Sequence, residues 1–181
     1  MNILVIHSHN ANRGDEAAVK AMVDELLIKY PGAKITISNN GFTPYPGMPE
    51  NVIQIDHFPK LESRIAQLEF FIVLLFKGKF ALTKEARKFI RALKEADVVL
   101  HAPGGDTYFK AEKLYLWRLN LIRRMGIPYI FYAPSMGPFN CASRNKLRKE
   151  VISGAERIIL RDPISVKYVK DFLPGVEVEQ A

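Results

Sequence analysis

Apolar residues fall along the chain in short runs, separated by longer segments in which they recur about every 3.6 positions. The first run, Asn2–His7, is apolar and contains several β-branched residues, which is typical of a buried central strand. The segment 15–30 has a helical period and ends before Pro31-Gly32. The same patterns predict further strands at 34–38, 52–55, 97–101, 127–132 and 155–160, and further helices at 61–76, 83–96, 108–125, 143–154 and 163–173.

Strands that alternate with helices indicate βαβ units and a parallel sheet. Because such crossovers are right-handed, helices are expected on both faces of the sheet. The sequence therefore predicts an α/β fold with a doubly wound, Rossmann-like parallel sheet of six or seven strands in three α/β/α layers. A length of 181 residues fits one domain, and no interior linker is visible. Residues 175–181 begin a further strand, which indicates either a small edge strand or one domain of a larger protein.

Composition places the chain among ordinary globular proteins, with 48% hydrophobic and 25% charged residues. The one cysteine, Cys141, excludes a disulfide framework or a cysteine-based metal site within the chain, and it fits a reducing cytosol. The N-terminus lacks the features of a signal peptide. The longest apolar run, Phe70–Phe76, is far shorter than the roughly 20 residues of a membrane span. We therefore expect a cytoplasmic protein, soluble or peripheral to the inner face of a membrane.

The net charge of +7 is unevenly distributed. Residues 1–60 carry five Lys/Arg against six Asp/Glu, whereas residues 61–181 carry 21 against 13. The second part therefore faces an anion, an anionic membrane or an acidic partner, or it is a solvated basic surface. Nucleic-acid binding is disfavoured, because the aromatic residues follow core periodicity rather than a stacking platform.

Ligands of open parallel sheets bind beyond the carboxyl ends of the strands, and four segments with unusual residues occupy that position. The first, 7–16, offers Asn12, Arg13, Gly14, Asp15 and Glu16. Capping of the following helix would account for Asp15, but we expect it to need neither Asn12 nor Arg13. The two histidines of this segment have no further ligands at usable spacing, so no metal site is expected.

The second segment, 101–108, contains Gly104, Gly105 and Asp106 directly after a predicted strand. Two glycines allow backbone N–H groups to approach a ligand closely. The segment is neither a Walker A loop nor a dinucleotide-binding fingerprint. It is therefore a candidate for anion or sugar binding without a nucleotide cofactor.

The third and fourth segments follow the next two strands. Residues 132–139 contain Ser135 and Gly137 in a rigid, proline-rich loop that is not a hydrolase nucleophile elbow. In the fourth, Asp162 is a predicted helix N-cap, and Arg161 beside it could hold a carboxylate or phosphate in a bidentate manner. A structural ion pair of Arg161 with Asp15 or Asp106 is the alternative.

Together the four segments resemble the polysaccharide pyruvyl transferase family, in the family's order and at plausible separations. The matching strings are Asn12-Arg13-Gly14-Asp15-Glu16-Ala17, Pro103-Gly104-Gly105-Asp106, Ser135-Met136-Gly137-Pro138 and Arg161-Asp162-Pro163-Ile164-Ser165. The resemblance implies a GT-B-like enzyme with two Rossmann-like domains, of which this chain is the N-terminal half and lacks the C-terminal one. It implies transfer of a pyruvyl group from phosphoenolpyruvate to two hydroxyls of a sugar in a cell-surface polysaccharide or lipid-linked precursor, giving a ketal.

The resemblance also gives roles to these residues. We expect Asp15 or Asp106 to act catalytically, by accepting a proton from an acceptor hydroxyl or by orienting it, and the backbone N–H groups near Gly104, Gly105 and Gly137 to bind an oxyanion. Arg161 would screen the donor's negative charge. The remaining predicted substrate-binding residues are Asn12, Arg13, Gly14, Glu16, Ser135 and Ser165. No metal or cofactor is expected beyond phosphoenolpyruvate as donor substrate.

Two other functions fit the same fold. One is a nucleotide-sugar glycosyltransferase with the two-domain plan, and the other is a non-catalytic sugar-binding module. Separately, Leu68–Lys94 joins the apolar run 70–76 to seven Lys/Arg residues between positions 77 and 94, a stretch in which Glu85 is the one acid. This pattern is typical of docking on anionic lipid, or of a buried core helix beside an ordinary basic face.

Overall fold

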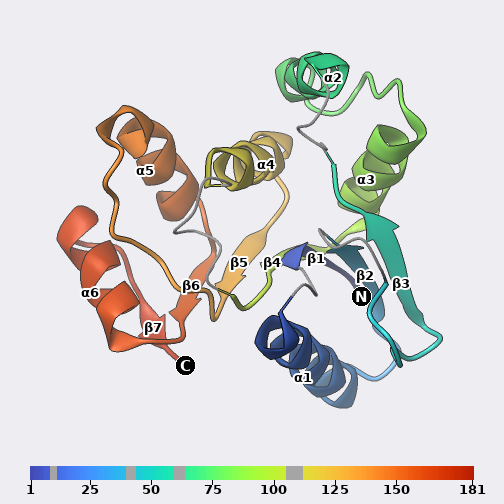
Figure 1. Ribbon diagram of the computed structural model, residues 1–181, viewed down its shortest axis with the longest axis horizontal. Helices are drawn as coiled ribbons and strands as arrows, with labels where there is room; N and C mark the ends of the chain where they lie inside the picture. The colour runs from blue at the N-terminus through green and yellow to red at the C-terminus, as the bar shows by residue number, and fades with distance from the viewer. Residues whose placement is uncertain (9–11, 40–43, 59–63, 105–111) are drawn as a thin grey trace. The chain divides into compact units, whose positions relative to one another are not determined.

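The computed structural model of the protein describes residues 1–8, 12–39, 44–58, 64–104 and 112–181 (Figure 1). Within these ranges, seven strands form one parallel sheet with the order β3-β2-β1-β4-β5-β6-β7. With six α-helices in the same ranges, the fold is an α/β Rossmann-like arrangement, so the predicted fold class is confirmed. The residues group into two compact units, Met1–Val99 (unit 1) and Leu100–Ala181 (unit 2). The prediction of a single domain over 1–181 stays a prediction.

Unit 1 contains the first three strands and the first three helices. Its elements are β1 (Asn2–Ser8), α1 (Arg13–Lys29), β2 (Lys34–Asn39), β3 (Val52–Asp56), α2 (Arg64–Leu75) and α3 (Lys84–Glu95). β4 (Val98–His101) begins in unit 1 and ends in unit 2. β2 pairs in parallel with both β1 and β3. Figure 1 shows α1 and α3 on opposite sides of these strands.

The core of unit 1 follows from the two apolar periods in the sequence. β1 is buried over Ile3–Ile6 without a break, as expected for a strand covered on both faces. α1 buries Val19, Met22, Val23 and Leu26, which recur at helical spacing along one side. α3 buries a second such stripe, which ends at Leu93. The apolar pattern therefore accounts for the position of both helices against the strands.

Unit 2 contains the remaining helices and strands. Its elements are α4 (Glu112–Met125), β5 (Tyr129–Tyr132), the short 3₁₀ helix η2 (Ala142–Arg144), α5 (Asn145–Ser153), β6 (Arg157–Leu160), α6 (Pro163–Phe172) and β7 (Glu179–Gln180). The buried Tyr129 ring lies in its core, and the Tyr129 hydroxyl donates to the carbonyl of Val151. Burial raises the pKa of this phenol.

The predicted elements agree with those observed to within a few residues at each end. The strand expected within 175–181 is β7, which pairs in parallel with β6 and is last in the strand order. The predicted starts of the helices 61–76 and 108–125 lie outside the described residues. No helix in the ranges that the structure describes is long and apolar enough to cross a membrane.

Candidate active site

The N-terminus of α1 carries the first predicted cluster. The side-chain oxygen Oδ1 of Asn12 accepts a hydrogen bond from the backbone N–H of Gly14 at 2.9 Å, and its carbonyl accepts from the N–H of Glu16 at 3.0 Å. Asn12 is therefore the N-cap of this helix. The interpretation that capping accounts for Asp15 without Asn12 is wrong, because Asn12 caps the helix and Asp15 lies within its first turn.

Arg13 and Glu16 face one another at the surface of the same turn. Nη1 of Arg13 lies 3.5 Å from Oε2 of Glu16, while the Arg13 side chain is 93% exposed. Both residues line a shallow groove of about 480 Å³ along α1, together with Lys20 and Asp24. Because charges of both signs line this groove, it suits a polar, uncharged ligand such as a sugar better than an anion.

Backbone strain marks the end of β1, directly before this cluster. The non-glycine residue His7 has a φ of 59°, and the β1–β2 pairing is irregular between Val5 and Ser8. Left-handed conformations of such residues cost free energy and concentrate at functional sites. The strained backbone at His7 was not predicted from the sequence. Among the described residues, no three His, Cys, Asp or Glu side chains gather to hold a metal ion.

In unit 2, the loops that follow β4 and β5 run side by side. Gly104 forms a parallel bridge with Pro134, and the N–H of Ser135 donates to the carbonyl of Gly104 at 2.9 Å. The structure thus brings the second and third predicted segments together. Gly105 and Asp106 lie outside the described residues.

Asp162 joins the loops that follow β5 and β6. Its Oδ1 accepts from the N–H of Ser165 at 2.7 Å, and its Oδ2 accepts from the hydroxyls of Ser165 at 2.8 Å and Ser135 at 3.0 Å. The Ser165 hydroxyl oxygen in turn accepts from the N–H of Met136 at 2.9 Å. Burial alone would raise the pKa of the Asp162 carboxyl, but the hydrogen bonds from Ser165 and Ser135 outweigh it and lower the pKa.

This arrangement gives the two serines a definite place. Ser135 is 3% exposed and Ser165 is fully buried, so both hydroxyls are engaged in holding the loops. Direct contact of either serine with a substrate stays a prediction. The predicted N-cap role of Asp162 is confirmed, with Pro163 at the start of α6. Sequence reasoning missed that Asp162 also binds Ser135, because no local pattern links the two residues.

Gly137 turns the loop after β5 in a way that only glycine allows. Its φ is +80°, and a Cβ built there would lie 2.6 Å from Cβ of Tyr168 on α6. The loop backbone therefore lies directly against that helix. Arg161 lies at the same end of unit 2, with a half-exposed side chain whose Nε is 3.9 Å from Oδ2 of Asp162. Its guanidinium is therefore partly open to solvent, and binding of an anion by it stays a prediction.

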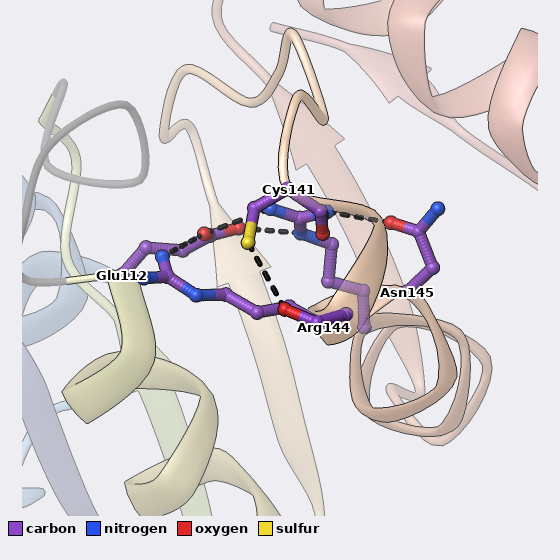
Figure 2. A network of polar contacts seen from close by, with 6 residues as sticks. Glu112, Cys141, Arg144 and Asn145 are labelled. Carbon is purple, nitrogen blue, oxygen red and sulfur yellow. Dashed lines mark hydrogen bonds and ion pairs between the residues drawn. The ribbon is translucent and has the colours of Figure 1, made fainter.

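A network of charged residues holds the rest of the β5–α5 segment (Figure 2). The Glu112 carboxylate of α4 accepts from Nε and Nη2 of Arg148 at 2.5 and 2.8 Å, and from Nη1 of Arg144 at 2.6 Å. Nη1 of Arg148 also donates to the carbonyl of Cys141 and to Oδ1 of Asn145. Burial would raise the pKa of Glu112, but the hydrogen bonds from Arg148 and Arg144 lower it.

This network was not predicted from the sequence. Glu112 is separated from Arg148 by 36 residues, and nothing in the local pattern links them. The only available signal was the presence of two arginines in a predicted helix of unit 2. The contacts fasten the start of α5 to the start of α4, and they thereby support the loop that carries Ser135 and Gly137.

Comparison with known proteins gives one family match. The model of a family described as polysaccharide pyruvyl transferase matches residues 12–180. The search of curated proteins found no match.

Proposed function

This chain belongs to the polysaccharide pyruvyl transferase family, and from that premise we propose that it takes part in transferring a pyruvyl group from phosphoenolpyruvate to a sugar. The acceptor is a sugar of a cell-surface polysaccharide or of its lipid-linked precursor. The observation that carries the proposal is the extent of the match, because residues 12–180 include the four matching strings, from Asn12–Ala17 to Arg161–Ser165. A GT-B-like plan, with this chain as the N-terminal half, is part of the same proposal.

The reaction requires two hydroxyls of the acceptor. One hydroxyl oxygen bonds to C2 of phosphoenolpyruvate while C3 gains a proton, and the second oxygen then displaces the phosphate. Two C–O bonds to the sugar form and the C–O bond to phosphate breaks. The two hydroxyl protons end on the new methyl group and on the released inorganic phosphate. The protein must therefore accept a proton from the acceptor and bind an anionic donor.

In this proposal, Asp15 or Asp106 accepts the proton of the acceptor hydroxyl. The position of Asp15 supports this role, since the first turn of a helix stabilises a carboxylate and Asn12 fixes the turn. The neighbouring Arg13 and Glu16 bind acceptor hydroxyls, a role supported by the groove that they line. Gly14 keeps the backbone accessible beside them.

The donor is assigned to the loops of unit 2. Arg161 binds the phosphate or carboxylate of phosphoenolpyruvate, supported by its exposed guanidinium. The backbone N–H groups of Gly104, Gly105 and Gly137 complete the anion site. Asp162, through Ser135 and Ser165, holds these loops in place. It is therefore a positioning residue rather than a catalytic one.

The test is release of inorganic phosphate from phosphoenolpyruvate by the full chain with lipid-linked N-acetylhexosamine acceptors. We expect phosphate release to require the acceptor, and Asp15→Ala or Asp106→Ala to lower the rate about a hundredfold or more. Glu25→Ala is the matched control, because Glu25 is an exposed carboxylate on the same helix as Asp15 and does not line the α1 groove. If both Asp15 and Asp106 variants keep full activity, the assignment of the base is wrong. Transfer from a nucleotide sugar instead would favour the glycosyltransferase alternative.

A further inference from the structure

Helix α2 is apolar on two opposite sides. One side packs into unit 1 through Phe70 and Val73, both fully buried, and the Phe70 ring lies 5.8 Å from that of Phe58. The other side is exposed. It carries four large apolar residues at intervals of three, three and four positions, which place them along one stripe of the helix: Ile65, Leu68, Phe71 and Leu75, exposed by 76%, 64%, 60% and 57%.

The exposed stripe continues into the turn between α2 and α3. Phe76, Phe80 and Leu82 are exposed by 44%, 52% and 64%, and the rings of Phe76 and Phe80 meet edge to face at 5.0 Å. Scattered single apolar residues on a surface are ordinary, but seven on one helix and its following turn form a contiguous patch. We call these seven residues the α2 patch.

The α2 patch is held facing outward by a buried carboxylate. Glu69 of α2 is 3% exposed, and its Oε1 accepts from the backbone N–H groups of Leu82 and Thr83, each at 2.7 Å. Thr83 is the N-cap of α3, so Glu69 fastens α2 to the start of that helix. Rotation of α2 to bury the patch would break these two charge-assisted hydrogen bonds.

A strongly basic surface follows directly from the patch. The turn and the outer side of α3 present seven cations between residues 77 and 94, against one acid, Glu85. A shallow groove of about 480 Å³ beside the patch is lined by Lys79, Arg87, Arg91 and Lys94. The single acid in its lining, Glu95, is paired with Arg91 at 2.7 Å. The groove therefore has a net positive charge.

We propose that the α2 patch and this basic groove dock the protein on an anionic lipid membrane. The occupant is chosen by charge complementarity, since large apolar side chains beside clustered Lys and Arg match the acyl boundary and the anionic headgroups of one surface. The attraction of each cation to such a surface falls off within a Debye length, so salt weakens it. Membrane docking is inferred from these residues alone. Only its purpose, which is to bring the site to a lipid-linked acceptor, depends on the proposed function.

The test is co-sedimentation of the full chain with vesicles of phosphatidylcholine alone or mixed with phosphatidylglycerol. We expect binding only to the anionic vesicles, weakened by salt. Phe71→Ser combined with Leu75→Ser, and separately Lys79→Glu combined with Lys94→Glu, should each weaken binding at least tenfold. These side chains are exposed, so thermal unfolding of the variants should match that of the unchanged protein.

Matched controls come from other surfaces of the protein. Ile28→Ser on α1 and Lys170→Glu on α6 change an exposed apolar residue and an exposed cation, and they should leave vesicle binding unchanged. Equal binding to neutral vesicles, no binding to anionic ones, or variants that bind like the unchanged protein would overturn the proposal. The proposal would also be overturned if the protein is a dimer in solution and the double serine variant is a monomer, because a second copy of the chain would then cover the α2 patch. The vesicle assay is independent of phosphate release, so either proposal can fail without the other.

Discussion

Replacement of Glu112 by glutamine tests how strongly the charged network supports the loops of unit 2. The Glu112 carboxylate accepts three hydrogen bonds from two arginines, and the Arg148 side chain is only 3% exposed. Removing one partner of a buried ion pair costs about 3–5 kcal/mol, because the remaining charge is left without compensation. Glutamine retains one acceptor oxygen, so we expect a loss near the lower limit, about 3 kcal/mol.

This loss should be visible as a shift in thermal unfolding. For a chain of this length, each kcal/mol lowers the unfolding midpoint by about 2–4 °C, so Glu112→Gln should lower it by about 6–12 °C. The control is Glu179→Gln, which removes a two-bond pair with Arg157 that is more than half exposed. An exposed pair contributes little to stability, so this variant should lower the midpoint much less than Glu112→Gln does. Equal midpoints for the two variants would refute the reasoning.

The pH dependence provides a second readout of the same variant. Because the folded protein lowers the pKa of Glu112, its contribution is present above the ordinary carboxyl pKa and is lost as pH falls through the folded value. The stability difference between the unchanged protein and Glu112→Gln should therefore narrow in acid. Replacing both buried partners, as Glu112→Leu with Arg148→Met, should cost less than Glu112→Gln alone, since the buried Arg148 charge is removed with its partner and only the partly exposed Arg144 loses a contact.

Three further variants test other parts of the account. Gly137→Ala should lower the free energy of unfolding by at least about 2 kcal/mol more than Gly32→Ala does. Both glycines have positive φ, but only at position 137 would the new Cβ clash with Tyr168; equal urea midpoints would contradict this. Asp162→Asn should raise KM for phosphoenolpyruvate with little change in kcat, as a positioning residue would; a hundredfold loss of kcat with unchanged KM would contradict it. Glu69→Gln should lower the free energy of unfolding by about 1–3 kcal/mol and weaken vesicle binding, because the hydrogen bonds that attach α2 to the start of α3 are weakened. Unchanged stability together with unchanged vesicle binding would show that the carboxylate is not needed.

The fold could be predicted well from the sequence, because the spacing of apolar residues follows directly from which positions are buried. The unbroken apolar run of β1 predicts a strand buried on both faces, and the helical stripe of α1 predicts a helix with one buried side. The structure shows both. α2 was harder to interpret. Its apolar residues lie on both sides, so periodicity alone did not separate a buried helix from a surface-docking one. Only the exposed fractions of the individual side chains distinguish its two sides.

The candidate site was predictable in its segments but not in its contacts. Segments that follow parallel strands must lie at one sheet edge, which correctly placed Gly104 beside the loop of Ser135. The hydrogen bonds of Asp162 to Ser135 and Ser165 depend on exact loop conformation, which sequence spacing does not encode. The capping role of Asn12 was missed because Asp15 is an equally good capping residue in sequence, and the start of the helix decides between them.

The most direct test of the proposed function follows the carbon atoms of the donor. The full chain is incubated with phosphoenolpyruvate carrying ¹³C at C2 and with a lipid-linked sugar acceptor, and the product is observed by NMR. The account predicts a ketal carbon signal bonded to two acceptor oxygens, formed in the same amount as inorganic phosphate. Label that remains in phosphoenolpyruvate, or that appears only as free pyruvate, would contradict it.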